Sequence, residues 1–317
     1  MITKSIICLA IIFRLLSLNS LADRFDGAIY KAESGNNIKA NASSYSLPLP
    51  FVFKNPTVDK FTEKPNISAK HYLLADLETN TVILKSNNKV KVPIASTTKI
   101  MTAAVVLENY KLNDIVTVSA SAASQAGSDA FLRVDEQITV KELLYCLLVK
   151  SANDSAFALA EHMNTMEQPG TDTFVQAMNL KARKLGMNDT NYRDPAGLDV
   201  TGMSSASDLY TITKYAMQNA TFRQMVATKD YVAKSADGQT YHQLENSNRL
   251  VGEYNYLGAI GVKTGYMPEA GHCLVSAVKR DGHTLIGVVL DTSADTPTAS
   301  ADESKKLMDW GFQNIKW

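Results

Sequence analysis

Cysteine is scarce in this sequence, and its histidines do not cluster. The 317 residues include only Cys8, Cys146 and Cys273, with no Cys-x-x-Cys pair, and five histidines that stand singly. This pattern excludes a disulfide framework and a zinc site of the usual spacing. Core or surface roles are favoured over metal binding for the histidines. We expect no metal and no other cofactor, and we expect Cys146 and Cys273 to remain unpaired.

An excess of charge of either sign is also lacking, because 32 Lys and Arg residues balance 32 Asp and Glu residues. This balance gives no indication of a nucleic-acid partner or of another strongly anionic partner. The chain is 45% hydrophobic and 20% charged, which is typical of a globular protein. It is long enough to bury a full hydrophobic core.

The apolar run near the N-terminus is too short to be a comfortable membrane span. It covers residues 5–18 and follows Lys4. Small residues at Ser20 and Ala22 then favour a secretory signal peptide of residues 1–22, cut after Ala22. A buried N-terminal helix is less favoured because helix caps are missing, whereas Arg14 leaves an uncleaved anchor open. We expect export across the cytoplasmic membrane to the periplasm or cell-wall space.

Residues 23–66 are polar and weakly patterned, and they include the stretch Pro48-Leu49-Pro50. Such a composition indicates an extended linker or a loosely packed arm. Regular hydrophobic patterns begin near Ala69. The sequence therefore predicts one folded domain over residues 67–317.

Strand patterns occur at both ends of this domain, with helical patterns between them. Apolar runs at 71–77 and 81–85 predict a hairpin, and three further strands are predicted at 259–265, 273–278 and 285–290. The intervening helical patterns lie at 139–149, 154–163, 171–185 and 207–218, and a closing helix is predicted at 301–310. Thr139 followed by Glu142 is a capping box, and Gly186 is a C-terminal cap.

This order of elements predicts an α/β fold. An antiparallel sheet would be built from both chain ends, flanked by helices, with an inserted all-helical region.

The stretch from Pro93 to Thr102 contains the pattern Ser-x-x-Lys at the start of a helix. Ser96 and Lys99 lie one turn apart and share a helix face. Serine is a weak nucleophile until a base takes its proton, and a desolvated lysine can be that base. The pattern alone is weak evidence, because it is expected about once by chance in a chain of this length.

Two further motifs follow in order. Ser151-Ala152-Asn153 lies between two predicted helices, and Lys263-Thr264-Gly265 ends a predicted strand. The ordered set resembles the penicillin-recognising serine enzymes, which have a β-lactamase/transpeptidase-like fold. Several other stretches resemble the low-molecular-mass penicillin-binding proteins of the D-alanyl-D-alanine carboxypeptidase and endopeptidase family. They are residues 93–102, 194–198, 246–250, 261–266 and 309–312.

The resemblance implies a catalytic role for four residues. Ser96 would attack the scissile carbonyl and form an acyl-enzyme, and Lys99 would accept its proton. Ser151 would relay a proton to the leaving amine. Asn153 would hold Lys99 or the substrate amide.

The resemblance also implies substrate-binding roles along one strand. Lys263 would supply positive charge that keeps Lys99 neutral and attracts the terminal carboxylate, which Thr264 would bind. Gly265 would leave room for the substrate beside the strand edge. The oxyanion hole would be formed by the backbone N–H groups of Ser96 and Tyr266.

The activity implied is removal of the terminal D-alanine from peptidoglycan stem peptides by a serine-type carboxypeptidase. A D,D-endopeptidase that cleaves peptidoglycan cross-links is the alternative, and β-lactam antibiotics would act as covalent inhibitors. No C-terminal membrane anchor is evident, because the sequence ends at Trp317, just past the predicted closing helix. The third residue of the stem peptide and the oligomeric state remain open.

Two rival functions are less favoured. A class A β-lactamase would need a glutamate followed four residues later by asparagine, and no glutamate between Asn153 and Lys263 has one. A non-catalytic penicillin sensor is disfavoured because Ser96, Lys99 and Lys263 are all intact. Arg249 is open between a carboxylate-binding role and an ordinary surface role.

Overall fold

The computed structural model describes residues 54–163 and 170–317. The predicted signal peptide, Cys8, Arg14 and the predicted arm up to residue 53 lie outside the described residues. Within the described part of the chain, no helix combines the length and apolar character needed to cross a membrane.

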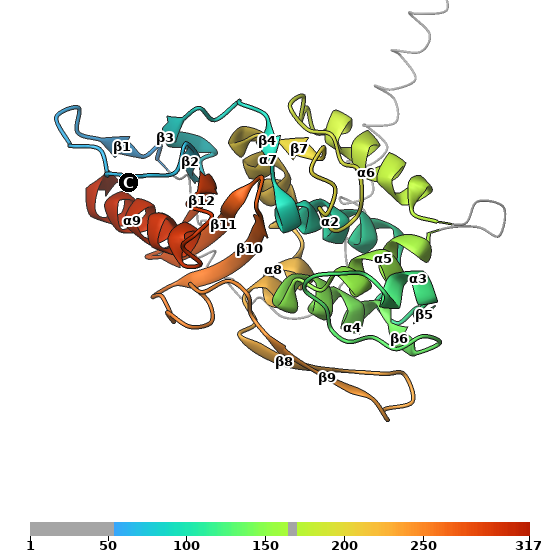
Figure 1. Cartoon of the computed structure of the whole chain (residues 1–317). Coiled ribbons are helices and arrows are strands. Elements are labelled where there is room, and N and C mark those ends of the chain that lie inside the picture. The colour runs from blue at the N-terminus through green and yellow to red at the C-terminus, as the bar shows by residue number, and fades with distance from the viewer. Residues whose placement is uncertain (1–53, 164–169) are drawn as a thin grey trace, which may run out of the picture. The chain divides into compact units, whose positions relative to one another are not determined.

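A five-stranded antiparallel sheet joins the two ends of the domain (Figure 1). The hairpin formed by β2 (His71–Asp76) and β3 (Thr81–Ser86) pairs with the last strand of a C-terminal meander. The meander consists of β10 (Ala259–Met267), β11 (Gly271–Arg280) and β12 (His283–Thr292). The strand order is β10-β11-β12-β2-β3, so β10 lies at a sheet edge. The prediction of a sheet built from both chain ends is confirmed.

Both faces of this sheet are covered, because successive side chains of a strand point to opposite faces. Leu74 packs in one buried cluster with Leu307 and Met308 of α9 (Ala299–Asn314). Its neighbours Leu73 and Ala75 belong to a second cluster on the other face. That face contacts α7 (Ala206–Ala216). The helix predicted at 301–310 therefore covers one face of the sheet.

The remaining helices form the inserted region. The predicted cap of α4 is confirmed, since Thr139 Oγ1 accepts a hydrogen bond from the N–H of Glu142 at 3.2 Å. The bounds are α2 (Lys99–Asn109), α3 (Ala120–Ala123), α4 (Val140–Tyr145), the π-helical turn η2 (Cys146–Lys150), α5 (Asn153–Glu161), α6 (Asp172–Lys184) and α8 (Ala220–Val226).

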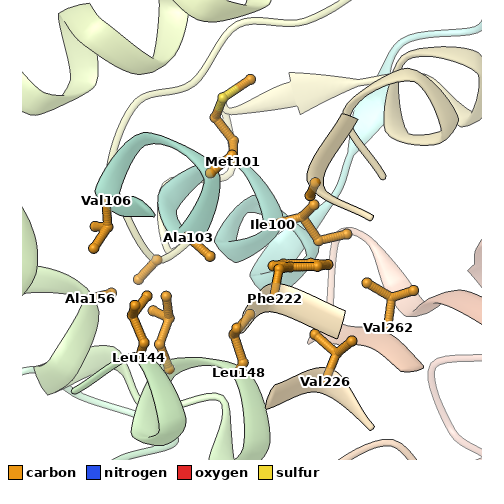
Figure 2. Packing of buried hydrophobic residues seen from close by; sticks show 14 of the residues in the cluster. Ile100, Met101, Ala103, Val106, Leu144, Leu148, Ala156, Phe222, Val226 and Val262 are labelled. Carbon is orange, nitrogen blue, oxygen red and sulfur yellow. The ribbon is translucent and has the colours of Figure 1, made fainter. Parts of the chain in front are cut away.

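Helix α2 lies at the centre of the larger core. Its residues 99–106 are all buried. Figure 2 shows its apolar side chains grouped with Leu144 of α4, Phe222 of α8 and Val262 of β10. The start of α2 is therefore held by helices on one side and by the edge strand on the other.

The inserted region also contains short strands that the sequence patterns did not predict. The longest pair is the hairpin of β8 (Asp230–Lys234) and β9 (Tyr241–Glu245), drawn at the bottom of Figure 1. Shorter pairs are β5 (Ile115–Thr117) with β6 (Gln137–Thr139) and β4 (Val92–Pro93) with β7 (Met203–Ser204). These strands bury few side chains, so their hydrophobic alternation is weak.

Residues near the start of the described chain contact its C-terminal elements. Strand β1 (Thr57–Val58) pairs with β13 (Ile315–Lys316), and Trp310 Nε1 donates to the carbonyl of Glu63 at 2.7 Å. These residues fall within the range predicted as an arm. The domain boundary at residue 67 stays a prediction.

The two cysteines within the described residues are buried free thiols. Cys146 belongs to η2 and Cys273 belongs to β11. The prediction that they remain unpaired is confirmed. Burial raises the pKa of Cys273 to about 12, so this thiol stays protonated at neutral pH.

Candidate active site

Ser96 and Lys99 lie in consecutive turns at the start of α2. Ser96 belongs to the 3₁₀ turn η1 (Ala95–Thr98), and Lys99 is the first residue of α2. Their side chains meet, with Lys99 Nζ 2.8 Å from Ser96 Oγ. Ala95 has a left-handed backbone with φ +46°. This conformation is uncommon for a residue other than glycine and is often found at functional sites.

The Lys99 amine is fully buried and is surrounded by oxygen atoms. Besides Ser96 Oγ, it donates to Asn153 Oδ1 at 2.7 Å and to the carbonyl of Ala196 at 2.9 Å. Asn153 is the first residue of α5, and its Nδ2 donates to the carbonyl of Ala126 at 2.6 Å. Of the two roles expected for Asn153, the structure therefore shows the contact with Lys99.

The loop at residues 194–199 fixes the carbonyl that contacts Lys99. Both carboxylate oxygens of Asp194 accept backbone hydrogen bonds, from the four N–H groups of residues 196–199. Thr102 Oγ1 donates to the carbonyl of Pro195 at 2.6 Å. Sequence reasoning did not assign a role to Asp194. The signal was present, because Asp followed by Pro and Gly is typical of a turn in which the aspartate side chain bonds the following backbone.

Strand β10 brings the third motif against η1. A Cβ atom at Gly265 would lie 2.9 Å from the carbonyl of Ile94 and 3.0 Å from the N atom of Ser96. Any side chain here would push the strand away from the serine. Thr264 Oγ1 lies 3.0 Å from Ser247 Oγ. Tyr266 is half-exposed, and its ring stacks on His272 with centroids 4.2 Å apart.

Ser151 lies in the turn between η2 and α5. It is buried and has a left-handed backbone, with φ +67°. It lines the same cleft as Ser96, with a volume of about 450 Å³. Asn153, Thr264, Gly265 and Tyr266 line this cleft too, while Lys99 and Lys263 are buried. The structure therefore brings the three sequence motifs together.

Burial controls the charge of the two lysines. It lowers the pKa of Lys99 from 10.5 to about 7, although the negative charges of Asp194 and Asp154 oppose this shift. Burial and the charge of Lys99 lower the pKa of Lys263 well below its usual value. The lowered pKa predicted for Lys99 is confirmed, but its cause is desolvation and not the expected charge of Lys263. Such a lysine can accept a proton from a serine near neutral pH.

A model of the D-alanyl-D-alanine carboxypeptidase family matches residues 58–294. The chain belongs to this family. Membership makes the protein a serine-type hydrolase. The matched range contains all eight residues expected at the site.

Individual members of the carboxypeptidase family are similar over most of the domain. DacF, a D-alanyl-D-alanine carboxypeptidase of Bacillus subtilis, is 35% identical over 255 residues, or 78% of this chain and 63% of the relative. This chain thus spans less than two thirds of the length of DacF. A D-alanyl-D-alanine endopeptidase of Escherichia coli is 33% identical over 230 residues, which are 72% of this chain and 73% of the relative.

A solved structure in the carboxypeptidase family has the same architecture. The Streptomyces K15 DD-transpeptidase has a TM-score of 0.73 and 35% sequence identity, covering 80% of this chain and 100% of that chain. The predicted fold class is therefore confirmed. The family match also favours a peptidase over the class A β-lactamase that was weighed as a rival.

Arg249 is a further residue at the cleft. Arg249 lines it together with Ser247 and is ion-paired with Glu253. It lines the same cleft as Thr264.

Proposed function

We propose that this protein is a serine-type D-Ala-D-Ala carboxypeptidase that removes the terminal D-alanine from peptidoglycan stem peptides. The observation that carries this proposal is the contact of Ser96 Oγ with Lys99 Nζ at 2.8 Å, where Lys99 is buried and has a pKa of about 7. An activated serine beside a neutral amine is the arrangement that acyl transfer requires.

The proposed reaction has two stages. Ser96 Oγ attacks the scissile carbonyl while Lys99 takes the hydroxyl proton, and the amide nitrogen leaves as D-alanine after receiving a proton through Ser151. Water then attacks the ester and gives a proton to Lys99, which passes it to Ser96 Oγ as the ester bond breaks and the shortened peptide leaves. Asn153 keeps the Lys99 amine aimed at Ser96 throughout.

Substrate binding is assigned to β10 and the start of η1. The peptide lies along the edge of β10, and Gly265 lets this strand approach the backbone of Ser96 closely. Thr264, whose hydroxyl accepts a hydrogen bond from the Lys263 amine, binds the terminal carboxylate with the assistance of Arg249. The backbone N–H groups of Ser96 and Tyr266 stabilise the oxyanion.

D,D-endopeptidase activity is the second candidate function. The same acyl-enzyme forms when the leaving amine belongs to a cross-linked peptide. The relative named as an endopeptidase in Escherichia coli favours this candidate. The two activities differ in their products, since only the carboxypeptidase reaction releases free D-alanine.

The test combines one variant with product analysis. Ser96→Ala is expected to abolish both D-alanine release from a peptide ending in D-Ala-D-Ala and covalent labelling by penicillin. Mass spectrometry of products from purified peptidoglycan separates free D-alanine from loss of cross-linked dimers. A penicillin-labelled peptide from another part of the Ser96→Ala protein would contradict the assignment of the nucleophile.

The proposed location is the periplasm or cell-wall space, where this enzyme would act in cell-wall biogenesis and cell shape and would meet β-lactam antibiotics. The support comes from the pattern of residues 1–22, followed by the arm at 23–66. N-terminal sequencing of the exported protein is expected to find a start near Asp23. A soluble cytoplasmic protein that begins at Met1 would overturn this proposal.

A further inference from the structure

Part of the cleft is lined by a loop that contains no helix or strand. The loop covers residues 124–136 between α3 and β6, and its residues Gly127 and Ser128 line the cleft. We call residues 126–132 the wall loop. Such a segment depends on partners from other elements for its backbone N–H and carbonyl groups. The partners of the wall loop lie on two elements that are far apart in the sequence, α5 and β9.

Asn153, at the start of α5, is bonded to the wall loop through its backbone and its side chain. Its N–H donates to the carbonyl of Ser128 at 2.7 Å. Its Nδ2 donates to the carbonyl of Ala126 at 2.6 Å, while its Oδ1 accepts from Lys99 Nζ at 2.7 Å. Both ends of the side-chain amide are thus hydrogen-bonded, one to the wall loop and one to the lysine. The position of the wall loop therefore determines where Asn153 holds the Lys99 amine.

The middle of the wall loop has an unfavourable backbone conformation. The buried carboxylate of Asp154 accepts from the N–H groups of Ala130 at 3.1 Å and of Leu132 at 3.0 Å. The residue between them, Phe131, has φ +59°, and its side chain is exposed. A left-handed backbone is unfavourable for a residue with a Cβ atom. Such a conformation persists only where surrounding contacts hold it, so the wall loop needs contacts besides those of α5.

His242 supplies one of these contacts from β9, in the hairpin at the bottom of Figure 1. Its Nδ1 lies 2.8 Å from the carbonyl oxygen of Ala130, and its Nε2 lies 2.7 Å from Oε1 of Glu136. A carbonyl oxygen only accepts, so Nδ1 carries a proton and donates it. The second contact also needs a proton between the two atoms, because two lone pairs at that distance would repel each other. The His242 ring therefore joins the wall loop to Glu136 by two hydrogen bonds.

The pair of His242 and Glu136 is itself fixed and nearly closed to water. Only 3% and 4% of the two side chains are exposed. The second carboxylate oxygen of Glu136 accepts from the N–H of Arg133 at 3.0 Å, and the Glu136 carbonyl accepts from the N–H of Val118 at 2.9 Å. Neither member of the pair lines the cleft, so neither would touch the substrate. Any effect of the pair on the reaction must pass through the wall loop.

We propose that His242 and Glu136 are positioning residues for the reaction at Ser96. They hold the wall loop in its unfavourable conformation, and the wall loop in turn holds Asn153. Without the pair the wall loop relaxes, the amide of Asn153 shifts, and the Lys99 amine is no longer directed at Ser96. The acylation step then slows, because a fast reaction needs the reacting groups held in the right geometry. The inference rests on the proposed acyl-enzyme at Ser96.

The pH profile of acylation separates this role from a general loss of stability. Protonated Lys99 forms a charge-assisted hydrogen bond to Asn153, which is about twice as strong as that of a neutral amine. A displaced Asn153 therefore destabilises the protonated lysine more than the neutral one, and the pKa of Lys99 falls further. The midpoint of the profile is expected to move at least about half a pH unit lower. A protein that is only less stable would keep the midpoint of the wild type.

The variants either remove or keep the hydrogen bonds of the pair. His242→Leu places an apolar side chain without donors in the buried site, so both bonds of the ring are lost. Glu136→Gln keeps them, because its amide nitrogen donates to Nε2 of a His242 ring protonated at Nδ1, while its oxygen still accepts from Arg133. Gln243→Ala changes the next residue of β9, which is exposed, and is the matched control.

The measurement is the rate constant of acylation at saturating penicillin between about pH 5 and 9, with circular dichroism as the control for folding. His242→Leu is expected to lower the plateau about tenfold and to move the midpoint to lower pH. Glu136→Gln and Gln243→Ala are expected to stay within about twofold of wild type, with unchanged midpoints. Glu136→Ala removes the acceptor of His242 and is the second variant, with the same expected result, should His242→Leu fail to fold.

Two results would overturn the positioning role. One is a folded His242→Leu protein with the midpoint of the wild type, even at a lower rate. The other is a loss in Glu136→Gln as large as the loss in His242→Leu, because that variant keeps the hydrogen bonds. In both cases the wild type still acylates, so the proposed function stands. A wild-type protein that does not react with penicillin at Ser96 would remove both proposals.

Discussion

Lys99 combines two properties that ordinary lysines do not have together. Its amine is fully buried, and three oxygen atoms from Ser96, Asn153 and Ala196 hold it in place. Desolvation lowers its pKa to about 7. These properties distinguish a catalytic base from a positive charge that only packs, and the distinction can be measured.

Replacing Lys99 by arginine tests whether a neutral amine is needed. Arginine keeps the positive charge but does not deprotonate in proteins. Lys99→Arg is expected to lower the rate of acylation by penicillin about a thousandfold or more, as losses of general bases do. The measurement is the acylation rate, with circular dichroism as the control for folding. A folded variant that acylates within about tenfold of wild type would show that Ser96 has another base.

The pH dependence of acylation follows from the same pKa. A lysine whose pKa is lowered is protonated below that pKa and neutral above it. The acylation rate is therefore expected to rise about tenfold per pH unit below pH 7 and to level off above it. A stopped-flow series with a chromogenic penicillin between about pH 5 and 9 gives the profile. A rate that falls as the pH rises through 7 would contradict a neutral Lys99 as the base.

At the scale of elements, three segments meet at the nucleophile: η1, β10 and the loop at 194–199. Two glycines permit the contact. Gly265 allows β10 to approach Ser96, and Gly197 allows the loop to approach Ala95. Gly197 has φ +79°, and a Cβ atom there would lie 2.0 Å from the carbonyl oxygen of Ala95. No side chain fits at that distance, so the backbone would have to move.

Gly197→Ala is therefore expected to displace the turn that carries Ser96. Gly238→Ala is the matched control, because Gly238 has φ +70° and a Cβ atom there would meet no other atom within 4 Å. Both variants bear the cost of a left-handed alanine, about 1–2 kcal/mol. Only Gly197→Ala is expected to lose a further large part of its stability and to acylate at least about a hundredfold more slowly. Thermal unfolding and penicillin acylation of both proteins are the measurements, and equal behaviour would refute the steric argument.

The helices and strands also show which structural features could be predicted from the sequence. The sheet strands were predictable because each contains an apolar run, and in β12 the run at residues 285–290 is buried on both faces. The site was predictable because its chemistry depends on particular residue types at Ser96, Lys99 and Lys263. Hairpin β8–β9 could not be predicted, because its strands are short and only Ala233, His242 and Leu244 in them are buried. Ser247 was named only within a similar stretch, and its contact with Thr264 depends on a fold that joins residues 17 apart.

At the scale of the whole domain, residues 315–317 contact both the start of the described chain and the five-stranded sheet. Strand β13 pairs with β1, and the next residue, Trp317, reaches the end of β2. Trp317 Nε1 donates to Oδ2 of the buried Asp76 at 2.8 Å, and the indole stacks on His283 with centroids 4.6 Å apart. A buried carboxylate needs such donors.

Trp317→Ala is expected to lower the free energy of unfolding by about 2–3 kcal/mol, because a buried charged acceptor loses a donor. Trp317→Phe keeps an aromatic ring but no N–H donor, so it is expected to lose part of that amount. Urea unfolding measures both. The rate of penicillin acylation should stay within about twofold of wild type in each, because Trp317 does not line the cleft. Unchanged stability in both variants would contradict a structural role for this contact.

The burial of Lys99 and Lys263 costs the folded protein free energy. Lys263 is fully buried, and within the described residues its amine donates hydrogen bonds only to Thr264, so an apolar side chain of similar volume would fit a dry site better. Burying an ionisable group without an opposite charge costs free energy, so an apolar replacement removes that cost. Lys263→Met is accordingly expected to unfold at a temperature no lower than wild type and yet to lose acylation, which differential scanning calorimetry and penicillin labelling can check side by side. Selection of variants for heat resistance alone would therefore favour inactive proteins with an apolar residue at position 263. Only a selection that also requires turnover would keep the lysine.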